Sequence, residues 1–261
     1  MIIFKRNLVK DTMILAGSIK TFGSYLILMR HVLSRPQRWS IFFRQMLHEI
    51  YQLGVNSIPI VLLISFFIGA VICIQMKLNV EVPWMPKFVV GYATREVLLL
   101  EFSSSIMCLI LAGKVGSNIT SEIGTMRVTQ QIDALEIMGV NSANFLILPK
   151  IAALVSMTPI LVIFSIAAGI AGAFAIGEFT GIITAEDLTI GLQHEFKQWY
   201  IWCSIIKSFA FSFIITSVAS FYGYRVSGGS IEVGKASTNA VVSCSVLILF
   251  SDMILTQLLM Q

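Results

Sequence analysis

Charged residues are scarce in this sequence. Only 12% of its 261 residues are charged, whereas 56% are hydrophobic. Soluble domains carry roughly 25% charged residues. A chain this apolar cannot cover its surface for water, so we expect it to lie in a lipid bilayer. The net charge of +4 is small and its basic residues are scattered, which argues against nucleic-acid binding.

Residues that form metal sites or disulfides are also few. The sequence has three histidines and four cysteines, with no C-x-x-C pair and no histidine at ligand spacing from a cysteine. Isolated cysteines in apolar stretches are typical of small buried side chains. We therefore predict no metal site, no catalytic residue and no bound cofactor on this chain. The cysteines are Cys73, Cys108, Cys203 and Cys244.

Five apolar stretches are long enough to cross a bilayer, which takes about 20 helical residues. We expect an all-α integral membrane protein in which residues 55–261 form a five-helix transmembrane domain. Residues 1–54 mix basic, aromatic and apolar positions, which favours N-terminal helices lying in the membrane interface. A sixth span over residues 12–33 is the alternative. The five expected spans are 55–76, 88–113, 151–177, 201–221 and 240–259.

The distribution of basic residues predicts the orientation. Thirteen of the eighteen Lys and Arg residues precede the first span or lie in the loops after spans two and four. Basic residues are enriched in cytoplasmic loops. We therefore expect a cytoplasmic N-terminus and, after five crossings, a C-terminus on the opposite side.

The loop between spans two and three is too long for a simple hairpin. Apolar residues recur at helical spacing from Val128 to Met138, which predicts a short helix over about residues 127–139. Gly139 suits its C-terminus, and Pro149 suits the start of the next helix. A lipid-binding helix would carry Lys and Arg on its polar face, but this face is acidic and amidic. We therefore favour docking into a protein partner over binding to the lipid surface or ordinary loop packing.

A near match to a phosphate-binding loop occurs at residues 229–236, G-S-I-E-V-G-K-A. The last position needs Ser or Thr to hold Mg²⁺, and it is Ala236. The stretch also lies between two expected spans, where there is no room for the sheet that such a loop requires. We predict that this chain is not an enzyme and does not hydrolyse ATP itself.

Residues 112–150, A-G-K-V-G-S-N-I-T-S-E-I-G-T-M-R-V-T-Q-Q-I-D-A-L-E-I-M-G-V-N-S-A-N-F-L-I-L-P-K, closely resemble the MlaE/YrbE family of ABC-transporter permeases. The resemblance implies a homodimer with an interfacial helix and five spans per subunit. It implies that the loop helix is a coupling helix seated on a separate ABC ATPase subunit, which uses ATP and Mg. It further implies that the transporter moves phospholipid between the bacterial inner membrane and a periplasmic MCE-domain protein. This transport would maintain the lipid composition of the outer membrane.

The resemblance also assigns candidate contacts. Glu101 matches a family glutamate in span two, but Leu100 stands where the family has arginine, and Gln130 replaces a glutamate in the loop. Candidate contacts to the ATPase are Glu122, Met126, Arg127, Gln130, Asp133, Glu136 and Met138.

A phospholipid cavity needs apolar walls and few charges. Arg95 is our candidate for contacting the phosphate. Glu101 is costly in lipid, and it either lines the cavity or pairs with Lys207 of span four. The candidate wall residues are Leu62, Phe66, Phe67 and Ile74.

Two other classes of protein compete with a permease. An ion-coupled secondary carrier would need a relay of ionisable residues or broken helices at midmembrane, and the charges within the spans are few for that. A membrane scaffold without transport activity would explain close helix packing but not a dedicated acidic loop helix.

Overall fold

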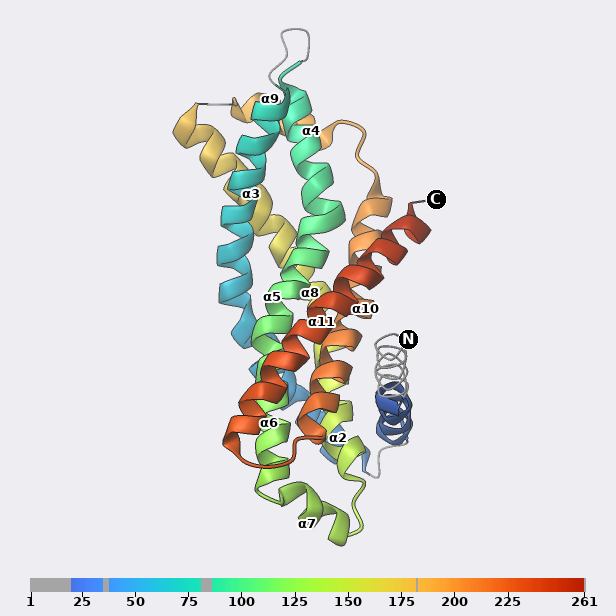
Figure 1. Ribbon diagram of the computed structural model, residues 1–261. Helices are drawn as coiled ribbons and strands as arrows, with labels where there is room; N and C mark the ends of the chain where they lie inside the picture. Colours follow the sequence, from blue (N-terminus) through green and yellow to red (C-terminus); the bar gives the residue numbers. More distant parts are fainter. Residues whose placement is uncertain (1–19, 35–37, 81–85, 182, 261) are drawn as a thin grey trace, which may run out of the picture.

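The computed structural model describes residues 20–34, 38–80, 86–181 and 183–260, and these contain no strand. Five helices are long and apolar enough to cross a membrane, which confirms the expected all-α membrane fold (Figure 1). The first helix is made of α2 (Trp39–Glu49), η1 (Ile50–Gly54), η2 (Val55–Ser57) and α3 (Ile58–Val80). The second helix is made of α4 (Phe88–Val97), η3 (Leu98–Ile106), α5 (Met107–Leu111), η4 (Ala112–Gly116) and α6 (Ser117–Val128). The others are α8 (Ser142–Thr180), α10 (Gln198–Tyr224) and α11 (Ser230–Leu259), with the short helices α7 (Gln131–Ile137) and α9 (Ala185–Gln193) between them.

The helices extend well past the apolar stretches that predict them. The first runs without interruption from Trp39 to Val80, so the expected boundary between residues 54 and 55 falls inside a helix. That region is marked only by the π-helical and 3-10 turns of η1 and η2. The expected spans are shorter because hydropathy detects the part of a helix suited to lipid, whereas the backbone continues into polar sequence. The near match at 229–236 forms the beginning of α11.

Close packing of α3 on α8 organises the bundle. A Cβ atom on Gly69 would lie 2.0 Å from the carbonyl oxygen of Gly169, and one on Gly172 would lie 2.0 Å from that of Phe66. Glycine at these positions therefore lets the two backbones touch. Ser65 and Ser165 hydrogen-bond across the same contact at 2.8 Å.

A further helix over residues 20–32 lies against α10 and the start of α8. The Tyr25 hydroxyl donates to the Ser217 hydroxyl at 2.9 Å, and Val32 is fully buried. Asn144 of α8 donates to the carbonyl oxygens of Val32 and Ser34. The alternative sixth span over 12–33 lies partly outside the described residues.

The two ends of the bundle are closed differently (Figure 1). At the end that we call the α9 end, the Thr184 hydroxyl accepts from the Asp187 amide at 3.2 Å and caps α9. Gly191 crosses so close to α4 that a Cβ there would lie 2.2 Å from the Phe88 carbonyl oxygen. At the opposite end, the α7 end, α7 projects between α6 and α8.

Candidate functional site

Three charged side chains from three spans meet within the bundle, and we call them the charged triad. The Lys207 ammonium lies 3.2 Å from Glu101 Oε1 and 2.9 Å from Asp252 Oδ1. Glu101 lies on η3, Lys207 on α10 and Asp252 on α11. Of the two roles open to Glu101, the structure therefore shows the pairing with Lys207.

Three oxygen atoms already surround the Lys207 ammonium. An ammonium group has three donors, and those of Lys207 have three oxygens within reach: the two carboxylates and the Leu100 carbonyl, at 3.1 Å. Lys207 itself is buried, whereas the Glu101 side chain remains 42% exposed. The Asp252 side chain is 13% exposed, so Glu101 supplies the outward-facing carboxyl group of the triad.

Arg95 does not occupy the position expected for a phosphate contact. Its guanidinium is only 2% exposed and donates to the carbonyl oxygens of Leu192 and His194 and to the Glu96 carboxylate, at 2.7 to 2.8 Å. It also lies over the Tyr92 ring at 4.9 Å. Arg95 therefore fastens the C-terminal end of α9 to α4. The sequence did not predict these contacts, because an arginine in an apolar stretch gives no sign of the carbonyls that surround it.

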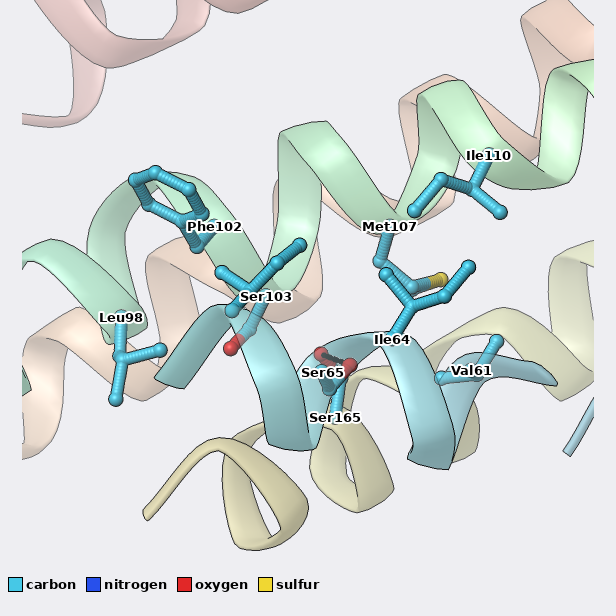
Figure 2. A pocket seen from close by; sticks show the side chains of 10 residues that line it. Val61, Ile64, Ser65, Leu98, Phe102, Ser103, Met107, Ile110 and Ser165 are labelled. Atoms are coloured by element: carbon cyan, nitrogen blue, oxygen red, sulfur yellow. Dashed lines mark hydrogen bonds between the residues drawn. The ribbon is translucent and has the colours of Figure 1, made fainter. Parts of the chain in front are cut away.

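A narrow crevice separates α3, η3 and α8, as Figure 2 shows. Its space of about 10 Å³ is about enough for one water molecule and far too small for an acyl chain. The Ser103 hydroxyl is buried there without a hydrogen-bond partner among the described residues. The crevice is lined on α3 by Val61, Ile64, Ser65 and Ile68.

The expected wall residues lie elsewhere on α3. Leu62, Phe66 and Phe67 are exposed and Ile74 is half-buried, because the face of α3 that packs on α8 is formed by neighbouring positions. Within one chain these four residues do not line the crevice.

The expected helix over 127–139 is divided in the structure. α6 ends at Val128 and α7 begins at Gln131, with Gln130 in the left-handed conformation at φ +60°. The end of α7 is as predicted: Gly139 has φ +77°, and the Val140 amide donates back to the Leu135 carbonyl, a Schellman-type cap. The predicted start of the next helix at Pro149 is wrong, because α8 begins at Ser142 and Pro149 lies inside it.

Most of the seven candidate ATPase contacts also bond within the chain. Glu122 accepts from Lys150, Arg127 pairs with Asp133 at 2.6 Å, and Glu136 accepts from two hydroxyls. Met126 is half-buried, and Gln130 and Met138 are exposed. The most exposed large apolar side chain of α7 is Ile137, at 87%, a residue that the sequence pattern did not distinguish.

Glu136 forms a compact network with Ser142 and Tyr224. Its Oε1 lies 2.9 Å from the Ser142 hydroxyl and 2.8 Å from the Tyr224 hydroxyl, and these two hydroxyls lie 2.8 Å apart. Hydrogen bonds from Tyr224 and then Ser142 lower the pKa of the Glu136 carboxyl below its usual value, because they favour the charged form. Glu136 is therefore an anion at neutral pH, held by α8 and α10.

Lys150 joins three helices near the α7 end. Its ammonium lies 2.6 Å from Glu49 of α2 and 2.8 Å from Glu122 of α6, while Lys150 itself, on α8, is 2% exposed. The second oxygen of Glu49 is buried without a hydrogen-bond partner among the described residues. We call this cluster the Lys150 junction.

The multi-pass helical fold, with charges inside the spans and a short helix projecting at one end, defines an integral membrane protein of the transport class. The sequence profile of the family described as Permease MlaE matches residues 46–258, and the chain belongs to this family of ABC-transporter permeases. Such a subunit is generally non-catalytic.

Related proteins cover most of the chain. A probable ABC transporter permease protein of Rickettsia bellii is 30% identical over 95% of both chains. A probable ABC transporter permease protein of Synechocystis is 30% identical over 84% of this chain and 82% of its own. The chloroplastic protein trigalactosyldiacylglycerol 1 of Arabidopsis thaliana is 28% identical over 90% of this chain and 67% of its own.

Several residues of these clusters escaped the sequence analysis. Asp252 was visible as the only charge in the last expected span, yet nothing in the sequence indicated that it shares Lys207 with Glu101. Glu49, Ser142 and Tyr224 carried no comparable signal, because polar residues at helix ends are common and their partners lie far away in the sequence.

Proposed function

We propose that this chain is the membrane subunit of an ATP-driven transporter that moves phospholipid between the bacterial inner membrane and a periplasmic MCE-domain protein. Two copies form the membrane unit, and a cytoplasmic ABC ATPase supplies the energy from ATP and Mg. The α7 end faces the cytoplasm in this proposal, and the C-terminus lies in the periplasm.

The observation that carries the proposal is the charged triad. Buried charges within membrane spans are costly and tend to mark substrate or ion pathways. The partly exposed Glu101 carboxylate gives this triad a polar group beside apolar helix faces, which suits a molecule with a charged head and acyl chains. The name of the Arabidopsis relative refers to a diacylglycerol lipid, which supports a lipid substrate.

The exposed side of α3 supplies the apolar wall in this proposal. Leu62, Phe66 and Phe67 are exposed in the single chain, and the crevice inside that chain is too small for a lipid. We therefore place the acyl chains between two copies, against these three side chains.

In this proposal the ATPase acts on the α7 end, and its movements open the cavity between the two copies alternately to one side and the other. Ile137 and Met138 are the exposed apolar side chains of that tip, and they suit insertion into a groove of the ATPase. The acidic and amide residues beside them favour a protein partner over anionic lipid.

Purification of the chain with its co-purifying subunits in mild detergent, followed by reconstitution into vesicles, tests the proposal. We expect an ATPase subunit and phospholipid to co-purify, and labelled phospholipid to move only when ATP is hydrolysed. A complex whose ATPase subunit is inactivated by substitution is the control. Lipid movement equal in both complexes, or absent from both, refutes the proposed function.

A further inference from the structure

The last turn of α10 is a meeting point of four helices. Tyr224 is the final residue of α10, and its hydroxyl contacts Glu136 of α7 and Ser142 of α8. Its ring lies beneath the Arg127 guanidinium of α6, 5.8 Å away. One residue earlier, Gly223 packs so closely on α6 that a Cβ there would lie 2.9 Å from the Thr120 carbonyl oxygen.

Of these four helices, α7 is the least firmly held. It has one buried residue, Ile132, and it follows a sharp break at Gln130. The Arg127–Asp133 pair bridges that break, but it is substantially exposed, and exposed ion pairs contribute little to stability. The contacts of Glu136 therefore decide how α7 is angled against the bundle.

The Glu136 network is suited to couple the movement of α7 to α8 and α10, because its hydrogen bonds are strong and can also be exchanged for bonds to water. Hydrogen bonds to a carboxylate are stronger than bonds between neutral groups. Tyr224 and Ser142 have one hydroxyl proton each, so two of the three short contacts carry hydrogen bonds at any moment. Glu136 is exposed, so water can replace either donor when α7 tilts.

The helix that carries Tyr224, α10, also carries Lys207 of the charged triad. Lys207 precedes Tyr224 by seventeen residues on α10, a distance of about 25 Å along a helix that rises 1.5 Å per residue. A continuous helix over this length passes a displacement of its end on to the charged triad.

We propose that Tyr224 and Ser142 are positioning residues that couple α7 to α10: their hydroxyls hold Glu136, so that movement of α7 is passed along α10 to Lys207. The inference rests on the proposed function in one respect, that the ATPase acts on α7. Tyr224 and Ser142 contact neither lipid nor ATPase in this scheme, and their effect is exerted through Glu136.

Tyr224→Phe tests the inference, because it removes the hydroxyl and keeps the ring under Arg127. Tyr222→Phe is the matched control, since the Tyr222 hydroxyl lies two residues away on α10 and bonds to Ser243 instead, at 2.8 Å. The readout is phospholipid moved per ATP hydrolysed by the assembled complex in vesicles. We expect this ratio to fall about tenfold in Tyr224→Phe, from loss of a hydrogen bond to a charged group, and to stay unchanged in Tyr222→Phe.

Four further measurements separate coupling from folding and from the proposed function. The subunit stoichiometry and the KM for ATP should match wild type in both variants, and the melting temperature should change by only a few degrees. Hydrogen exchange of the α7 amides should become several-fold faster only in Tyr224→Phe. Wild-type transport per ATP in Tyr224→Phe, or unchanged α7 exchange, overturns the inference. Failure of the wild-type complex to move lipid refutes the proposed function instead, and the exchange result then still decides whether Tyr224 holds α7.

Discussion

Replacing Lys207 by methionine should separate the structural role of the charged triad from its role in transport. The substitution leaves Glu101 and Asp252 as two unpaired carboxylates among the membrane helices. Asp252 is 13% exposed and Glu101 is 42% exposed, so Glu101 is the less deeply buried of the two. Breaking a buried ion pair by removing one partner costs about 3–5 kcal/mol, and the partial exposure of Glu101 favours the lower end.

The loss should be visible in thermal unfolding of the purified protein in detergent. One kcal/mol shifts the midpoint by roughly 2–4 °C in a chain of this size, so Lys207→Met should lower it by about 6–12 °C. A variant that also carries Glu101→Gln and Asp252→Asn has no unpaired charge. It should regain most of the stability, since neutral replacements of buried ion pairs are often tolerated.

Transport by the neutral triple variant then decides the role of the triad. If the triad contacts the phospholipid headgroup during transport, this variant should fold and bind the ATPase subunit. Its rate of phospholipid movement should nevertheless be reduced about tenfold or more. Unaltered melting of Lys207→Met would refute the reasoning on stability. Full transport by the stable triple variant would show that the triad only joins helices.

Three further predictions concern the α7 end and the helix crossing. Lys150→Met should destabilise the chain by about 3–5 kcal/mol, measured by thermal unfolding, with partial recovery when Glu49→Gln is added. Gly172→Leu should separate α3 from α8, because its Cβ would lie 2.0 Å from the Phe66 carbonyl oxygen, and should abolish accumulation of folded protein. The Glu136 network lowers the pKa of that carboxyl from its usual value near 4.5, so its full stabilisation of α7 is present at pH values above 4.5. This stabilisation is lost as the pH falls through the lowered pKa. Hydrogen exchange of the α7 amides, corrected for intrinsic rates, should therefore become faster in that acid range.

Each of these predictions has a matched control. Lys235→Met removes an exposed lysine that, among the described residues, pairs with Glu232, and it should leave the melting temperature within about 1 °C. Gly113→Ala adds a Cβ with open space around it and should be tolerated. Glu136→Gln should abolish the acid-dependent change in α7 exchange; a change that persists would assign it to another group.

The apolar pattern of the sequence was sufficient to predict five membrane helices, because burial in lipid requires long uninterrupted runs of one kind of residue. It did not predict how far helices extend beyond lipid: α8 starts at Ser142 because the Asn141 side chain caps it, and Pro149 is accommodated within it. The break at Gln130 was also missed, since glutamine rarely adopts positive φ and nothing else marks the position.

The candidate site could be predicted only in part. A glutamate in a span implies a partner, and Lys207, the partner named from the sequence, pairs with Glu101 in the structure. Arg95 illustrates the limit of this reasoning, because its partners are backbone carbonyls of α9, and carbonyls are present at every residue. A charge in a span thus indicates that a partner exists without identifying it.

Main-chain carbonyls also hold η3 in place beneath the charged triad. Ser204 and Lys207 of α10 donate to the main-chain carbonyls of Leu99 and Leu100, so these acceptors survive any replacement of the two leucine side chains. An alanine scan of this stretch will therefore understate its importance. Insertion or deletion of one residue, which rotates the carbonyls out of register, is the perturbation that should expose it.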